Sequence, residues 1–208
     1  MKAFSNDKEK KVLKEFANHY GKSQAQLIRE FKLPITEKER KNIRSIIINA
    51  ILNKEKDDFV LDNIKIKTIT INSQGAPMES MSFAQIKYKE IVNEEWGNSY
   101  LYKMLTSKFL FVVFMLKNKD DKNPILVNAK FWKMNKSDLE IASKFWELTQ
   151  DNIRRGDYKN FITIKNNFIC HVRSKGINSK DLMETPQGTK EPKKGYWLNS
   201  SYIKTQIN

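Results

Sequence analysis

The segment KFLFVVFML at residues 108–116 constrains the fold more than any other stretch of the sequence. After Lys108 its residues are apolar without interruption, and it is far shorter than the roughly 20 residues that a membrane-spanning helix needs. A run of this kind is typical of a central strand covered on both faces. The segment NPILVNAKFWKM at residues 123–134 is interpreted as its neighbour in the same sheet.

Helices are predicted on either side of these strands. Residues 7–32 and 36–53 carry apolar residues at helical spacing. Gly21 and Ser23 break the first stretch, with Ser23 as an N-cap, and Thr36 with Glu39 forms a capping-box pattern. A further helix over 137–156 is predicted to start at Ser137 and to end at Gly156.

Residues 64–71 alternate with the period of a strand. Ile64 and Ile66 share one face, and the parity changes at Ile69, which predicts a bulge near Thr68. NFITIKNNFICHV at 160–172 predicts one or two further strands, and GYWLNSSYIKTQI at 195–207 a short strand followed by a helix. Together these elements predict an α/β fold in a single domain over residues 1–208, with 1–53 mainly helical and 54–208 a mixed sheet.

The charge distribution points to a polyanionic partner. Residues 1–53 carry 12 Lys and Arg against 6 Asp and Glu, residues 159–208 carry 9 against 3, and the net charge is +14. Such a surface attracts nucleic acid, although a lysine-rich solvated surface is the simpler alternative. The single cysteine, Cys170, excludes an internal disulfide and predicts a buried free thiol. The charged start of the chain and the lack of long apolar runs predict a cytoplasmic protein without a membrane partner.

The stretch DDFVLDNIKIKTIT at 57–70 has the layout of a metal-dependent nuclease strand. Phosphodiester cleavage by such enzymes uses carboxylates that converge on Mg²⁺, together with a lysine near the developing charge. On a strand, residues i and i+2 share a face, so an acid-x-lysine triplet delivers both groups to one pocket. Here the triplet is Lys65-Ile66-Lys67, and an ammonium in the metal position repels Mg²⁺.

The longer segment DDFVLDNIKIKTITINSQGAPMESMSF resembles the active-site segment of the MutH mismatch-repair nuclease family. HVRSKGINSKDLMETPQGTKEPKKGYWLNSSYI resembles the C-terminal segment of the same family, an arginine-led DNA-reading loop followed by an aromatic strand. With SKFLFVVF, the match covers most of residues 40–208 in order. It is most similar to the Sau3AI-type, GATC-cutting restriction endonucleases, which have a catalytic MutH-like half and a DNA-binding, regulatory one. The resemblance implies a restriction-endonuclease-like fold.

The resemblance assigns the catalytic positions one at a time. Asp58 matches the first carboxylate of the family, and Lys67 matches the motif lysine. Lys65 occupies the position of the essential glutamate, and Asn49 occupies that of a further acid. These are therefore expected to be remnant positions, with no catalytic residue and no metal site in this chain. Mg²⁺ is expected only for a catalytic domain. In the alternative, Asp58 binds metal together with Glu79 or Asp62.

The resemblance also assigns the DNA-reading residues. Arg173 falls on the arginine of the loop and suits guanine, since its fork donates two hydrogen bonds to O6 and N7. Glu79 falls on the glutamate that accepts from cytosine N4, and Trp197 falls near the tyrosine that senses adenine. The remaining expected DNA contacts are Ser174, which departs from the usual proline, Lys175, Gly176, Lys65, Lys67, Lys108, Lys193 and Lys194.

These observations predict a GATC-specific duplex-DNA-binding domain, acting as the allosteric or effector part of a type II restriction endonuclease. The chain is expected not to be an enzyme on its own. Its expected partners are GATC-containing DNA and the catalytic MutH-like half. Two alternatives remain: an active Mg²⁺-dependent endonuclease with a rearranged pocket around Asp58 and Glu79, and a basic module that docks an acidic protein.

Overall fold

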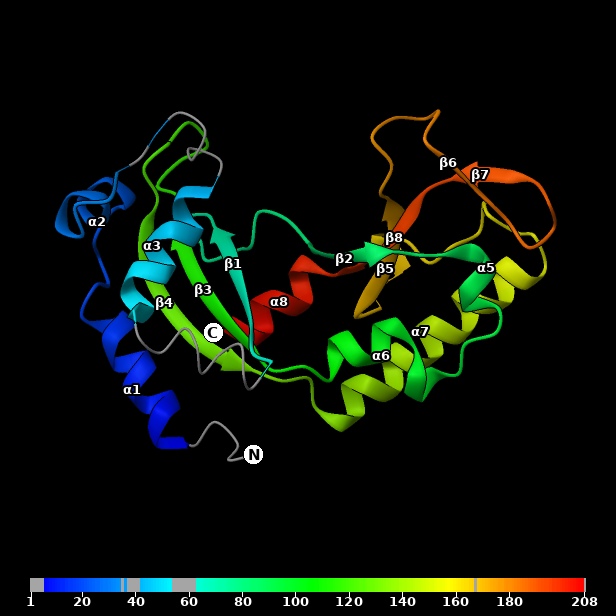
Figure 1. Ribbon diagram of the computed structural model, residues 1–208, viewed down its shortest axis with the longest axis horizontal. Helices are drawn as coiled ribbons and strands as arrows, with labels where there is room; N and C mark the ends of the chain where they lie inside the picture. Colours follow the sequence, from blue (N-terminus) through cyan, green and yellow to red (C-terminus); the bar gives the residue numbers. More distant parts are fainter. Residues whose placement is uncertain (1–5, 35, 37–41, 54–62, 167, 208) are drawn as a thin grey trace. The chain divides into compact units, whose positions relative to one another are not determined.

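The computed structural model describes residues 6–34, 36, 42–53, 63–166 and 168–207 (Figure 1). The chain divides into two compact units. Unit 1 holds residues 1–78, 107–132 and 204–208, and unit 2 holds residues 79–106 and 133–203. Helices and strands are mixed along the chain, which confirms the predicted α/β class. That the whole chain forms a single domain stays a prediction.

Unit 1 is built on a mixed sheet with the strand order β1-β3-β4. β1 (Lys65–Ile71) runs parallel to β3 (Phe109–Met115), and β3 runs antiparallel to β4 (Ile125–Trp132). Residues 109–114 of the middle strand are all buried. The continuous apolar run therefore predicted its strand correctly, because a strand with neighbours at both edges and side chains packed on both faces has no solvated position.

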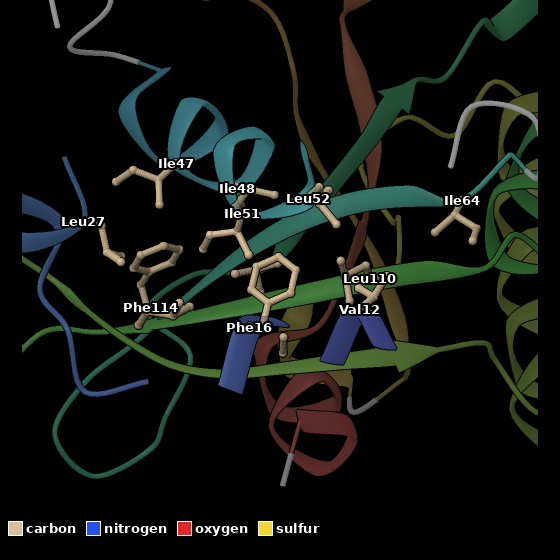
Figure 2. Close-up of a cluster of buried hydrophobic side chains, with 13 residues drawn as sticks. Val12, Phe16, Leu27, Ile47, Ile48, Ile51, Leu52, Ile64, Leu110 and Phe114 are labelled. Carbon is tan, nitrogen blue, oxygen red and sulfur yellow. The ribbon is translucent and has the colours of Figure 1, made fainter. Parts of the chain in front are cut away.

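Three helices pack on one face of this sheet: α1 (Asn6–Ala17), α2 (Gln24–Glu30) and α3 (Ile43–Leu52). Their apolar side chains meet Leu110, Val112 and Phe114 of β3 in a buried cluster (Figure 2). Each large side chain buried in this way stabilises the fold by about 1.5–3 kcal/mol. This packing holds helices that are too short to be stable alone. The helices contribute Val12, Phe16, Leu27, Ile47, Ile48, Ile51 and Leu52.

The break between α1 and α2 is confirmed. Gly21 has a φ of +82°, and Ser23 forms a full capping box with Gln26. Gln26 N–H donates to Ser23 Oγ over 3.4 Å, and Ser23 N–H donates to Gln26 Oε1 over 2.8 Å. The second expected capping box includes Glu39, which lies outside the described residues.

The predicted bulge near Thr68 is wrong. β1 and β3 stay in register from Lys65 opposite Phe109 to Ile71 opposite Met115. The change of parity has another cause, since β1 buries apolar residues on both faces. Ile66 packs into the helical core, and Ile69 is buried on the opposite face.

Unit 2 contains an antiparallel sheet with the order β2-β8-β5. It comprises β2 (Met81–Gln85), β8 (Lys194–Leu198) and β5 (Cys170–Ser174). A separate hairpin pairs β6 (Leu182–Glu184) with β7 (Lys190–Pro192). β8 leads into α8 (Ser200–Ile207), as the tail pattern predicted. The shorter helices are α5 (Tyr88–Ile91), η3 (Trp96–Asn98), α6 (Tyr100–Leu105) and η4 (Ile164–Asn166).

The long helix α7 (Lys136–Arg154) confirms the helix predicted over 137–156, but its N-cap is Asn135 instead of Ser137. Asn135 has extended backbone, and its Oδ1 accepts from Asp138 N–H over 2.8 Å, which is the geometry that a cap requires. Gly156 follows the helix with a φ of +73°. In the described part of the chain, no helix is long and apolar enough to cross a membrane.

Candidate nucleic-acid interface

The unit 2 sheet has two chemically different faces, because successive residues of a strand point to opposite sides. α7 covers one face, where Phe145 packs edge-on against Tyr196 with ring centroids 6.0 Å apart. Burial there raises the pKa of the Cys170 thiol, as expected for a buried free thiol. This apolar face consists of Cys170, Val172, Tyr196 and Leu198. The opposite face presents aromatic and cationic side chains.

Trp197 is the centre of a cluster on this opposite face. The Arg173 guanidinium carbon and the Lys175 Nζ each lie 5.2 Å from the centroid of its ring. His171 pairs with Trp197 across β5 and β8, and their rings stack with centroids 6.4 Å apart at 22°. Both cations are within the roughly 6 Å at which attraction to an aromatic face is significant. These four residues are called the Trp197 cluster below.

His171 is the buried member of the Trp197 cluster, with 3% of its surface exposed. Its Nδ1 hydrogen-bonds to Asn199 Oδ1, while Asn199 Nδ2 donates to the carbonyl of Phe168. The amide oxygen is therefore an acceptor, which makes His171 Nδ1 the donor. Burial lowers the pKa of His171, and the charge of Arg173 lowers it further. A neutral imidazole at pH 7 leaves two positive charges in the cluster instead of three.

Gly195 makes room for the Lys175 side chain. Gly195 lies opposite Arg173 in the sheet. A Cβ at this position would lie 3.1 Å from Lys175 Cδ and 3.2 Å from the carbonyl oxygen of Ala84. The absence of a side chain thus lets the stem of Lys175 cross β8 toward Trp197.

The loop over residues 175–181, called the 175–181 loop below, is held by Asp181. Its carboxylate accepts from the backbone N–H of Ile177 over 3.0 Å and pairs with Lys193 Nζ at 2.5 Å. The Lys193 ammonium, and then the Ile177 N–H, keep the pKa of Asp181 below its usual value. Lys193 was predicted to contact DNA; the structure pairs its ammonium with Asp181, and DNA contact by Lys193 stays a prediction.

Four other predicted residues also belong to unit 2. Ser174 ends β5 in an exposed position opposite Lys194, which is half-buried at the start of β8. Gly176 packs against Asp181, where an added Cβ would lie 3.1 Å from the Asp181 Cβ. Glu79 is exposed two residues before β2. DNA contact by these four residues stays a prediction.

In unit 1, Lys65 and Lys67 lie together on one face of β1. Their partners in the parallel register are Phe109 and Phe111, which identifies the face opposite the helical core. The Lys65 ammonium donates to Asn63 Oδ1 over 3.4 Å. β1 thus presents two positive charges side by side, as the alternation of the sequence predicted.

Lys108 and Asn49 do not join this pair. Lys108 forms an ion pair with Glu9 of α1, and its ammonium lies 5.3 Å from the centroid of the Phe131 ring. Phe131 packs against the helical core, so Lys108 lies on the helix-covered side of the sheet. Asn49 is half-buried within α3.

Among the described residues, no three or more His, Cys, Asp or Glu side chains come close enough to hold a metal ion. Lys65 and Lys67 present ammonium groups, which repel a divalent cation. Asp58 and Asp62 lie outside the described residues.

Comparison with known proteins agrees with the resemblance. Residues 48–144, which include β1, β3 and β4, match the family model described as DNA mismatch repair enzyme MutH. The type II restriction enzyme Sau3AI of Staphylococcus aureus is 28% identical over 225 residues, which cover 82% of this chain and 45% of that enzyme. Both matches support a MutH-like family for this chain. The match to the MutH family model confirms the restriction-endonuclease-like fold. The chain spans about half the length of this curated relative.

These two matches also correct one prediction. The loss of family carboxylates at Lys65 and Asn49 predicted that the chain is not an enzyme on its own. Both matches are to enzymes, the MutH mismatch repair enzyme and the restriction enzyme Sau3AI, and this likeness contradicts the prediction. The physical error was to treat these two positions as decisive. Mg²⁺ is commonly bound through one or two carboxylates plus substrate phosphates, so the loss of two family carboxylates does not by itself exclude metal binding.

Sequence reasoning missed three residues of the unit 2 surface: His171, Asp181 and Gly195. The spacing of His171 from Arg173 was an available signal, because residues two apart on a strand share a face. Asp181 gave no such signal, because its partner Lys193 comes close only through the β6-β7 hairpin.

Proposed function

We propose that this chain binds double-stranded DNA containing the sequence GATC as part of a type II restriction endonuclease. The main support for this proposal is the Trp197 cluster. Arg173 is exposed and rests against an aromatic ring, with a second cation beside it. A guanidinium held in this way has less freedom to lose when it donates its two hydrogen bonds to guanine O6 and N7.

The choice of GATC rests on the sequence resemblance to the GATC-cutting restriction endonucleases. On this basis Arg173 contacts guanine, and Glu79 accepts a hydrogen bond from the N4 amine of cytosine. Lys175 and Lys194 contact phosphates, which position the duplex without reading its sequence.

Fluorescence anisotropy with a GATC duplex and a scrambled duplex, at two salt concentrations, tests the proposal. We expect the wild type to prefer GATC, and Arg173→Ala to remove that preference at a cost of about 1–3 kcal/mol. Lys144→Ala is the control, because Lys144 is exposed on α7, which covers the other face of the sheet. Equal binding of both duplexes by the wild type would contradict the proposal and favour a basic protein-docking module.

DNA cleavage is the second proposed activity, and the likeness to MutH and to the restriction enzyme Sau3AI favours it. Plasmid nicking with Mg²⁺ or Mn²⁺, and with a chelator, tests it directly. We expect metal-dependent nicking that Asp58→Ala abolishes and Asp120→Ala, at an exposed position between β3 and β4, leaves unchanged. Nicking that survives Asp58→Ala would show that Asp58 is not part of the active site.

A second MutH-like half is the other proposed partner, since the chain aligns with 45% of the length of Sau3AI. If GATC binding here acts as an effector signal, binding and cleavage are coupled. In an enzyme with both halves, a short GATC duplex should then change the cleavage rate of a separate substrate. Arg173→Ala should remove this effect.

A further inference from the structure

Ile177 stands out among the apolar side chains of the described residues. It is 94% exposed, whereas the other large exposed apolar side chains are 39–49% exposed. Exposure alone does not indicate a binding site, because single exposed apolar residues are common on protein surfaces. The conformation and the surroundings of this residue distinguish it.

The 175–181 loop displays Ile177 on a turn that is held by hydrogen bonds. Ile177 N–H donates to Asp181 Oδ2 over 3.0 Å, and Asp181 N–H donates to the carbonyl of Asn178 over 3.1 Å. At the start of the loop, Lys175 N–H donates to the carbonyl of Lys193 over 2.9 Å. Because the loop is already ordered, it loses little conformational entropy when a partner binds.

The surroundings of Ile177 are cationic. Lys175 and Lys180 flank it in sequence, and Arg173 comes four residues earlier. These charges favour a polyanion over an apolar protein patch. On the base edges of the major groove, the apolar group is the 5-methyl group of thymine. In GATC, an A·T pair stands next to each outer G·C pair, so a thymine methyl adjoins the guanine proposed for Arg173.

We propose that Ile177 is a specificity-determining residue that packs against the 5-methyl group of a GATC thymine in the major groove. This inference rests on the proposed GATC binding. The apolar contact adds discrimination for the inner base pairs to the hydrogen bonds of Arg173 at the outer ones.

Replacing the thymines of GATC by deoxyuridine removes only the methyl groups, which gives a direct test. With fluorescence anisotropy, we expect wild type to bind the thymine duplex about fourfold more tightly than the deoxyuridine duplex. Ile177→Ala should bind both duplexes equally, while Ile177→Val should keep part of the difference. Ile164→Ala, at an isoleucine 49% exposed in η4, is the matched control and should behave as wild type.

The outcomes separate this inference from the proposed function. If wild type does not prefer GATC over a scrambled duplex, the proposed function fails and the inference fails with it. If GATC is preferred but Ile177→Ala still distinguishes thymine from deoxyuridine, the inference alone is overturned. Equal weakening toward both duplexes by Ile177→Ala, with thymine still preferred, also overturns it and indicates insertion of Ile177 elsewhere in the duplex. An unchanged thermal unfolding midpoint confirms that the variant is folded.

Discussion

Trp197 combines a structural cost with a role in the proposed interface. In the described part of the chain, its Nε1 is buried without a hydrogen-bond partner. Leaving a buried donor unpaired costs about 1–3 kcal/mol. Its indole ring nevertheless receives Arg173 and Lys175, and indole is the aromatic ring that attracts cations most strongly. The ring of Trp197, and not its N–H group, therefore makes the contacts with Arg173 and Lys175.

This difference predicts effects of different size for two substitutions of Trp197. Trp197→Phe keeps a ring and removes the unpaired donor, so we expect its free energy of unfolding to stay within about 1 kcal/mol of wild type. Trp197→Ala removes the ring and should cost about 2 kcal/mol or more, together with most of the GATC affinity. Urea unfolding and anisotropy measure the two effects. Equal destabilisation by both substitutions would contradict this division between ring and N–H.

The two histidines predict a loss of stability in mild acid. Burial is the main cause that lowers the pKa of both His19 and His171 in the folded chain. Below the unfolded value of 6.5, the unfolded chain therefore binds more protons than the folded chain, and the free energy of unfolding falls as pH falls. The stability from each histidine is fully present above pH 6.5 and is lost as the pH drops toward and through its folded pKa.

Urea unfolding at about pH 7.5 and about pH 5.5, on either side of the unfolded histidine pKa, measures this loss. His171→Gln and His19→Gln should each reduce the difference between the two pH values, and the double variant should reduce it most. An unchanged pH dependence in the double variant would assign the effect to carboxylates.

At the scale of elements, the sequence predicted best what local pattern decides. β3 was recognisable because its apolar run is unbroken, and the start of α2 because Ser23 and Gln26 form a local capping box. Tertiary contacts decided the rest. The bulge in β1 was predicted wrongly because β1 packs apolar residues on both faces. Contacts between residues distant in sequence pair Lys108 with Glu9 and Lys193 with Asp181. The sequence can identify a lysine as a candidate DNA contact, but the fold determines which side chain it pairs with.

The 175–181 loop gives a prediction at this scale. Asp181→Asn keeps the side-chain shape but loses the charge that holds Lys193. Because a looser loop must be ordered on binding, we expect GATC affinity to fall roughly twofold to tenfold, with the global unfolding midpoint nearly unchanged. Trypsin should also cleave faster after Lys175 and Lys180. Asp120→Asn is the exposed control, and unchanged affinity and proteolysis in Asp181→Asn would show that this carboxylate does not organise the loop.

For the whole molecule, the question is whether DNA contacts both units. Unit 2 carries the Trp197 cluster, and unit 1 carries Lys65 and Lys67 on one face of β1. A net charge of +14 ensures some attraction to DNA, so affinity alone does not identify the contacting residues. The salt dependence of binding identifies them, because each neutralised phosphate releases counterions and contributes about −0.9 to the slope of log K against log salt concentration.

We therefore predict that replacing Lys65 and Lys67 together by alanine makes the slope shallower by about 2, because two phosphates are no longer neutralised. The preference for GATC over a scrambled duplex should persist, because phosphate contacts position the duplex and carry no sequence information. Lys119 and Lys122, exposed between β3 and β4, form the matched control, and their double alanine variant changes net charge equally. An equal change of slope in both variants would assign the effect to overall charge. An unchanged slope in the Lys65 and Lys67 variant would confine the phosphate contacts to other residues and leave β1 outside the DNA-binding surface.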